Sequence, residues 1–150
     1  LVRAGAAASL VLAALPFAGL RFVDTAQAAP GRVGDVETVS YAPARIDALR
    51  AEGRGVFIDF TAAWCVTCQV NKLTVLSRED VAAAFADNDV TLMVADWTRR
   101  DPVITEALAG FGANGVPLYV YYPPEGAPVV LPQPLTARAI VQTVQSSKRS

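Results

Sequence analysis

The 150 residues are enough for one folded domain and an additional segment, and with 53% hydrophobic and 18% charged residues the chain is not disordered. The net charge of −1 gives no support to nucleic-acid binding, which would call for a basic face. The sequence contains no histidine, which excludes histidine-based acid–base catalysis, a Ser-His or Cys-His dyad and most transition-metal sites.

Residues 1–28 differ from the rest because Ala4 to Leu20 is an uncharged, mostly apolar run flanked by arginines. One hypothesis is a signal peptide cleaved after Ala26-Gln27-Ala28. The other is the end of a transmembrane helix, because this run spans about 26 Å and a hydrocarbon core is about 30 Å thick. The start at Leu1 instead of Met favours a fragment whose preceding residues complete the span. Both hypotheses place the following residues outside the cytoplasm.

Prolines and glycines in residues 29–42 predict a linker before a domain of residues 43–150. Pro43 to Glu52 has helical spacing, and the apolar run Gly55 to Thr61 predicts a central strand. Asp59 is the one charged residue of this strand, and burying a carboxylate is costly unless it is paired. It is either at an exposed edge or a buried proton acceptor with a raised pKa.

The only two cysteines, Cys65 and Cys68, begin a segment with helical spacing that continues to Leu76. The first turn of a helix has unpaired N–H groups and the positive end of the macrodipole, so it stabilises a thiolate at Cys65. A thiolate is the nucleophile of disulfide exchange, and Cys68, one turn later, can resolve a mixed disulfide. The pattern favours redox chemistry over a zinc site, a structural disulfide or two buried thiols, and a Cu(I) site stays open.

The rest of the chain predicts strands that alternate with helices, followed by a hairpin. Trp97 is expected to pack in the core or at its rim. A proline that opens a β run, as Pro117 does, is allowed at the first residue or on an edge. We expect helices that follow caps at Ser77, Asp101 and Thr136, and strands over residues 90–95, 117–121 and 129–131.

The stretch Asp59-Phe60-x-Ala62-x-Trp64-Cys65-x-x-Cys68 resembles the active site of the thioredoxin superfamily. Within it, residues 64–71 and 95–98 are most similar to the C-terminal periplasmic domain of the DsbD family of transmembrane disulfide reductases. The resemblance covers roughly residues 40–146. It departs at Lys72, where that family often has an acidic residue, which puts acidic tuning of the thiols from this position in doubt.

The resemblance implies an α/β thioredoxin fold, with a central mixed β-sheet flanked by helices. It assigns the attacking thiol to Cys65, the resolving thiol to Cys68, and assistance in deprotonating the resolving thiol to Asp59. It also implies that Pro117 is cis beside the cysteines and that the Val116 backbone pairs with a substrate strand. We add the neighbouring Trp64 to the substrate-binding residues.

The activity implied is that of a thiol:disulfide oxidoreductase that passes reducing equivalents to periplasmic proteins, with the Cys65–Cys68 disulfide as its redox group and no other cofactor. Its electrons would come from a membrane-embedded cysteine pair, and the domain would be tethered at the periplasmic face of the bacterial inner membrane. A free-standing periplasmic thioredoxin, for instance one for cytochrome c maturation, is the alternative. Strong oxidants of the superfamily place a histidine between the cysteines, so Val66-Thr67 favours a reductant.

Overall fold

The computed structural model describes residues 31–147, so the apolar segment predicted for residues 1–28 lies outside the described residues. Within the described part of the chain, no helix has the length and apolar character needed to cross a membrane. The elements are β1 (Gly31–Val33), β2 (Val36–Ser40), α1 (Pro43–Ala51), β3 (Gly55–Thr61), α2 (Val66–Asn71), η1 (Lys72–Leu76), α3 (Glu79–Asp87), β4 (Val90–Asp96), α4 (Pro102–Gly110), β5 (Leu118–Tyr122), β6 (Val129–Val130) and α5 (Ala137–Ser147).

The strands of the described residues form one mixed sheet in the order β1-β2-β4-β3-β5-β6. Strand β3 lies at its centre, parallel to β4 and antiparallel to β5. All seven residues of β3 are buried, which confirms the central strand predicted from its apolar run. Because β2 and β4 are also parallel to β3, the carboxyl ends of these three strands meet at one edge of the sheet.

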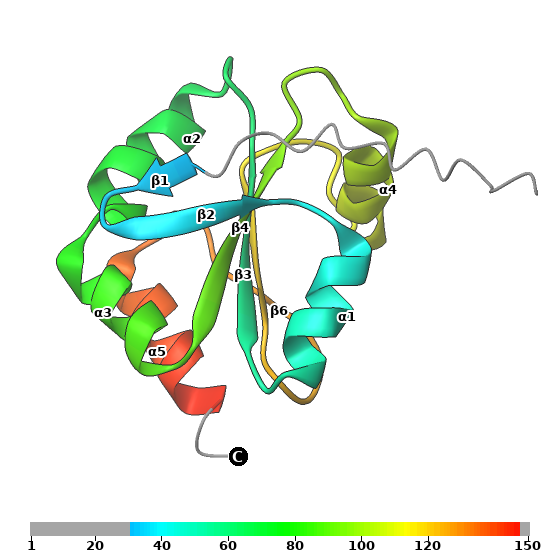
Figure 1. The fold of residues 1–150 in the computed structure, drawn as a ribbon. Helices are drawn as coiled ribbons and strands as arrows, with labels where there is room; N and C mark the ends of the chain where they lie inside the picture. The colour runs from blue at the N-terminus through cyan, green and yellow to red at the C-terminus, as the bar shows by residue number, and fades with distance from the viewer. Residues whose placement is uncertain (1–30, 148–150) are drawn as a thin grey trace, which may run out of the picture.

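Helices cover both faces of the sheet, as predicted (Figure 1). Helices α1 and α4 lie on one face, where their apolar residues contact Val56, Ile58 and Phe60 of β3. Helices α2, α3 and α5 cover the other face, where Phe57 joins the core. Side chains of a strand point alternately to its two faces, so Asp59 lies on the same face as Phe57, beneath α2.

The prediction of a linker over residues 29–42 is wrong for the residues that the structure describes, because β1 and β2 form a hairpin that extends the sheet. Strand β2 pairs with β4, with Thr38 opposite Leu92. Gly34 turns the hairpin with a positive φ of 57°, and a Cβ there would meet the backbone of Ser77 at 2.8 Å. Glycine therefore marks a tight turn against the end of η1 and not a flexible connection.

Two of the three predicted helix caps are confirmed. The Asp101 side chain accepts hydrogen bonds from the first backbone N–H groups of α4, and the Thr136 hydroxyl accepts one from the N–H of Ala139. The capping box at Ser77 is wrong, because its hydroxyl donates instead to the Leu73 carbonyl and α3 begins two residues later. The preceding helix widens into the π-helix η1, whose end occupies Ser77.

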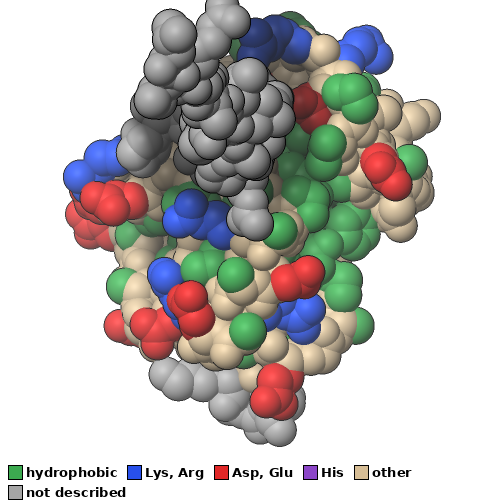
Figure 2. Space-filling view, turned by 45° about the vertical axis from the view of Figure 1, so that its right-hand side comes forward, with side chains coloured by type: hydrophobic (Ala, Val, Ile, Leu, Met, Phe, Trp, Pro, Cys, Tyr) green, Lys and Arg blue, Asp and Glu red, His purple; other side chains and the backbone are tan. Residues whose placement is uncertain are grey.

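One face of the molecule, turned by 45° from the first view, shows how its charges are distributed (Figure 2). Acidic and basic side chains are interspersed there, and hydrophobic side chains lie between them. Contacts made through this face would therefore not be dominated by one sign of charge.

Candidate functional site

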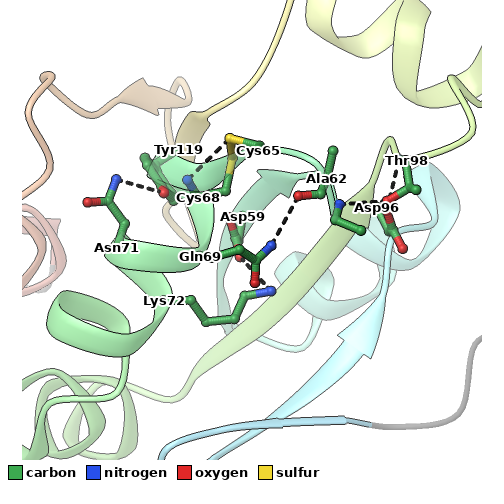
Figure 3. Close-up of a disulfide and its surroundings, with 11 residues drawn as sticks. Asp59, Ala62, Cys65, Cys68, Gln69, Asn71, Lys72, Asp96, Thr98 and Tyr119 are labelled. Carbon is green, nitrogen blue, oxygen red and sulfur yellow. Dashed lines mark hydrogen bonds and ion pairs between the residues drawn. A yellow bond between two sulfur atoms is a disulfide. The ribbon is translucent and has the colours of Figure 1, made fainter.

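Cys65 and Cys68 are joined by a disulfide at the start of α2, with their Cα atoms 5.2 Å apart (Figure 3). Cys65 is the N-cap residue, and its Sγ accepts a hydrogen bond of 3.2 Å from the backbone N–H of Cys68. Cys65 is 7% exposed and Cys68 1% exposed, so Cys65 is the more accessible of the two cysteines. This order agrees with the roles of attacking and resolving thiol that the resemblance implies.

The turn between β3 and α2 is held by hydrogen bonds from within the helix. The carbonyl of Ala62 accepts from the backbone N–H of Cys65 and from the Gln69 side chain, both at 3.0 Å. The turn therefore holds Cys65 at the beginning of the helix.

The second stretch that carries the resemblance, residues 95–98, holds the same turn from the end of β4. The Thr98 hydroxyl accepts from the N–H of Ala63 at 2.8 Å, and the Thr98 carbonyl accepts from the Trp64 indole at 3.2 Å. The Asp96 carboxylate in turn accepts hydrogen bonds from the hydroxyl and the N–H of Thr98. These contacts give the stretch a structural role in positioning the disulfide.

The two tryptophans near the disulfide differ in burial. Trp97 is buried and donates to the Thr105 hydroxyl at 2.8 Å, which confirms the predicted packing role. Trp64 packs against it with ring centroids 6.1 Å apart, yet 52% of its surface is exposed. A large aromatic side chain held by a hydrogen bond and exposed beside a disulfide is suited to contact a partner.

The Val116-Pro117 peptide bond is cis, as the resemblance implied. Val116 is partly buried against the cluster formed by Ala62, Cys65 and Cys68. Segments far apart in the sequence therefore meet at the disulfide. The structure contains a second cis bond, Gln133-Pro134, that the sequence analysis did not predict.

Asp59 is 1% exposed, and neither of its carboxylate oxygens accepts a hydrogen bond. The edge interpretation is therefore wrong, because Asp59 is buried. Its role as a proton acceptor stays a prediction. Burial raises the pKa of Asp59 from 3.8 to about 6, although the nearby Lys72 ammonium opposes this rise. A carboxyl with a pKa near neutrality can take up and release a proton under ordinary conditions.

Residues of α2 and η1 place polar side chains on the side of the helix that faces the sheet and Asp59 (Figure 3). Asn71 and Lys72 follow Cys68 by three and four residues, so they lie on the same helical face as Cys68. The Asn71 amide donates to the Tyr119 hydroxyl at 3.1 Å, and Tyr119 lies opposite Asp59 in the sheet. Desolvation by burial raises the pKa of Tyr119 to about 12, so its phenol stays neutral.

The Lys72 Nζ lies 3.9 Å from the Asp59 Oδ2, and 26% of the Lys72 side chain is exposed. Lys72 also lines a cavity of about 380 Å³ beside the disulfide turn. The other residues that line this cavity are Thr61, Ala62, Ala63, Gln69, Val94 and Asp96. Four of these seven residues are polar or charged, so the cavity is suited to hold water. Lys72 borders the cavity and contacts Asp59, which does not itself line it.

The structure thus gathers all six predicted site residues around one disulfide: Cys65, Cys68, Asp59, Trp64, Val116 and Pro117. Sequence reasoning missed the contributions of Gln69, Asn71, Lys72 and Thr98. Helical spacing held a usable signal for two of them, because residues three and four positions after Cys68 must share its buried face. For Thr98 the only signal was the resemblance of residues 95–98 to the family, because nothing in the local sequence shows which turn its hydroxyl contacts.

Sequence comparison finds relatives that carry the name of disulfide-exchange proteins. The thiol:disulfide interchange protein DsbD 2 of Pseudomonas aeruginosa is 34% identical over 88 residues, which are 56% of this chain and 15% of that protein. DsbD of Ralstonia nicotianae is 34% identical over 96 residues, or 63% of this chain and 16% of that protein. The chain therefore matches about one sixth of the length of these relatives.

Solved structures share the fold. The oxidised C-terminal domain of DsbD from Neisseria meningitidis has a TM-score of 0.57 and 22% identity, covering 69% of this chain and 90% of that one. The DsbH oxidoreductase has a TM-score of 0.59 and 17% identity, covering 78% of this chain and 88% of that one. The thioredoxin-like family matches residues 37–124, more than half of the sequence and all of the predicted site residues. The chain belongs to the thioredoxin-like family.

Proposed function

We propose that the chain is a thiol:disulfide oxidoreductase that reduces disulfides of partner proteins through Cys65 and Cys68. The single observation that carries the proposal is the disulfide at the N-terminus of α2, with Cys65 as its more accessible cysteine and a buried carboxyl on the sheet below. The names of the relatives, which are thiol:disulfide interchange proteins, support the same chemistry.

In the reductive direction, the Cys65 thiolate attacks one sulfur of a partner disulfide. A Cys65–partner S–S bond forms, and the electron pair of the broken bond leaves with the other partner sulfur. The backbone N–H of Cys68, which now points at Cys65 Sγ, stabilises the attacking anion. Cys68 then gives its proton to Asp59 and attacks Cys65 Sγ, which releases the reduced partner and restores the disulfide.

The partner's chain would dock beside the disulfide against Trp64 and the backbone of Val116. Trp64 is exposed there, and Val66 next to the attacking sulfur is 76% exposed. These apolar side chains surround a reactive group that is itself small and mostly buried. Contacts with a protein partner would thus be set by the surface around the disulfide more than by the sulfur atoms.

Direction and location are further parts of the proposal. The absence of histidine from the whole sequence supports a reductant, because no imidazolium can stabilise the thiolate between the cysteines. The resemblance to the C-terminal domain of DsbD supports a tether at the periplasmic face of the inner membrane. Electrons would then arrive from a membrane-embedded cysteine pair of the same or another protein, and cytochrome c biogenesis is one pathway class that such a reductant can serve.

The test is disulfide reduction by the purified protein in the presence of dithiothreitol, with insulin as substrate. We expect faster insulin reduction than with dithiothreitol alone, and a redox potential nearer to about −270 mV than to about −120 mV. A protein that leaves the insulin rate unchanged, and whose Cys65 is alkylated no faster than an ordinary thiol, would contradict the proposed activity. A potential near about −120 mV would contradict the reductive direction alone.

A further inference from the structure

The ion pair between Lys72 and Asp59 connects the interior of the site to its surface. Lys72 is one helical turn beyond Cys68, and its side chain passes beneath the helix to within 3.9 Å of Asp59 Oδ2. The β1–β2 hairpin lies on the other side of Lys72, where Arg32, Val33 and Thr38 line a second cavity together with the lysine. The Lys72 side chain is partly buried, which strengthens its interaction with Asp59 over that of a fully exposed pair.

Within residues 31–147, few charged or titratable groups face Asp59 besides this lysine. Helix α2 contributes Cys68, and β5 contributes Tyr119, whose phenol is neutral. From β4, the residue opposite Asp59 is the apolar Val94. Asp96 lies further along β4 at the cavity lining, where its carboxylate accepts hydrogen bonds from Thr98. Lys72 is therefore the cation that acts on Asp59.

We propose that Lys72 is a positioning residue that holds Asp59 in its ionised, proton-accepting form for Cys68, and that the adjoining cavity is the path by which the proton leaves. The inference rests on the proposed function. An ammonium group at this place reverses the charge that the resemblance led us to expect, so this chain would resolve mixed disulfides at a lower pH than a variant with an acidic residue there.

The resolving step forms one S–S bond and breaks another. The Cys68 thiol gives its proton to the Asp59 carboxylate, and the Cys68 sulfur attacks Cys65 Sγ. The new bond is Cys65–Cys68, the broken bond is Cys65–partner, and the partner sulfur leaves as a thiolate with the electron pair. The proton then passes from Asp59 to water in the cavity lined by Thr61, Gln69 and Lys72, and the ionised carboxylate again faces the ammonium.

The first experiment titrates Asp59 in the oxidised protein, where Cys65 and Cys68 are in the disulfide and carry no titrating thiol. Carboxyl carbons are observed by NMR after ¹³C-aspartate labelling, and Asp59 is assigned by its loss in Asp59→Asn. We expect the wild-type midpoint near pH 6 and a midpoint about one pH unit higher in Lys72→Met. Lys72→Gln should behave as Lys72→Met does, and Lys72→Arg should stay near the wild type.

The matched control is Arg54→Met, which removes one positive charge at the opposite end of β3. It should leave the Asp59 midpoint where the wild type has it. An unchanged midpoint in both Lys72→Met and Lys72→Gln, or an equal shift in Arg54→Met, would overturn the assignment. This titration needs no catalysis, so its outcome is independent of whether the proposed function holds.

The second experiment separates attack from resolution with the reagent dithionitrobenzoate. Reduced protein releases one nitrothiobenzoate when Cys65 attacks and a second when Cys68 resolves, so the second phase reports the step that uses Asp59. We expect the low-pH limb of the second phase to move up by about one pH unit in Lys72→Met, about fivefold slower at pH 6, while the first phase changes less.

A merely structural role for Lys72 would change both phases by the same factor and leave the shape of the pH profile intact. That outcome, or a profile that does not move, would overturn the inference while wild-type insulin reduction still supports the proposed function. If the wild type reduces neither insulin nor dithionitrobenzoate, the proposed function fails instead.

Discussion

The two faces of the central strand β3 differ in what they bury. On the α1 and α4 face, Val56, Ile58 and Phe60 are fully buried among apolar side chains. On the other face, Phe57 is equally buried, but Asp59 and Thr61 follow it with side-chain oxygens that have no hydrogen-bond partner. Burial on the first face stabilises the fold. On the second face the unsatisfied polar oxygens lower the stability at the end where the disulfide lies.

The difference shows that the cost of the site is local. Strand β3 carries both sets of residues on one backbone, so apolar burial on the first face holds the strand in place while polar groups remain unsatisfied on the second. Each fully buried large apolar side chain contributes about 1.5–3 kcal/mol, enough for a few such neighbours to offset one buried carboxylate. Buried polar groups with perturbed pKa values are common at the functional sites of proteins.

The largest effect is expected from replacing the cysteines, which abolishes disulfide exchange at the polar face. Cys65→Ser should reduce insulin turnover to the rate of dithiothreitol alone, because no attacking thiolate remains. Cys68→Ser should instead accumulate a mixed disulfide with its partner, detectable by mass spectrometry before and after reduction. Trapping by Cys65→Ser and not by Cys68→Ser would reverse the two roles.

The second effect tests the apolar face. Ile58→Ala removes a fully buried side chain and should lower the free energy of unfolding by about 2–5 kcal/mol, measured by urea denaturation of the oxidised protein. The folded fraction should keep its redox potential, because Ile58 faces away from the disulfide. A changed potential with little loss of stability would show that the two faces are not separable in this way.

The third predicted effect is a gain in the free energy of unfolding, from a substitution at Asp59, the residue after Ile58. The folded-state pKa of Asp59 is raised from 3.8 to about 6, so the native state binds its proton more tightly than the unfolded state and loses stability as pH rises through this window. Asp59→Asn does not titrate and should be more stable than wild type by about 3 kcal/mol at pH 7.5, with the pH-dependent part of this gain absent below pH 3.8.

Urea denaturation of the oxidised protein at both pH values measures that difference, with Asp47→Asn on the exposed side of α1 as the matched control. The same Asp59→Asn variant should resolve mixed disulfides more slowly near neutral pH, because Cys68 loses its proton acceptor. A variant that is more stable but equally fast would show that Asp59 lowers the stability of the fold without taking part in the reaction.

The smallest effect concerns the surface beside the disulfide. Trp64→Ala removes a half-exposed ring, so the free energy of unfolding should change by no more than about 1 kcal/mol. Reduction of insulin should slow by about tenfold, whereas the rate with dithionitrobenzoate, which needs no docking surface, should stay close to wild type. Equal slowing with both substrates would assign Trp64 to the geometry of the disulfide and not to partner binding.

The sequence by itself determined the local features: the buried strand β3, the cysteines at the start of the following helix, the caps at Asp101 and Thr136, and Pro117 at the opening of β5. Each of these depends on residues that are neighbours along the chain, where spacing and residue type decide the conformation. The resemblance added the cis state of Pro117 and the order of the two thiols.

Only the tertiary structure decided what lies around Asp59. The β1–β2 hairpin looked like a linker because its strands are short, because a proline and glycines precede and separate them, and because its partner β4 is some fifty positions away. That hairpin lines a cavity together with Lys72, and the lysine reaches a carboxylate thirteen residues earlier in the chain. Such contacts depend on which surfaces the sheet brings together, and no local pattern specifies them.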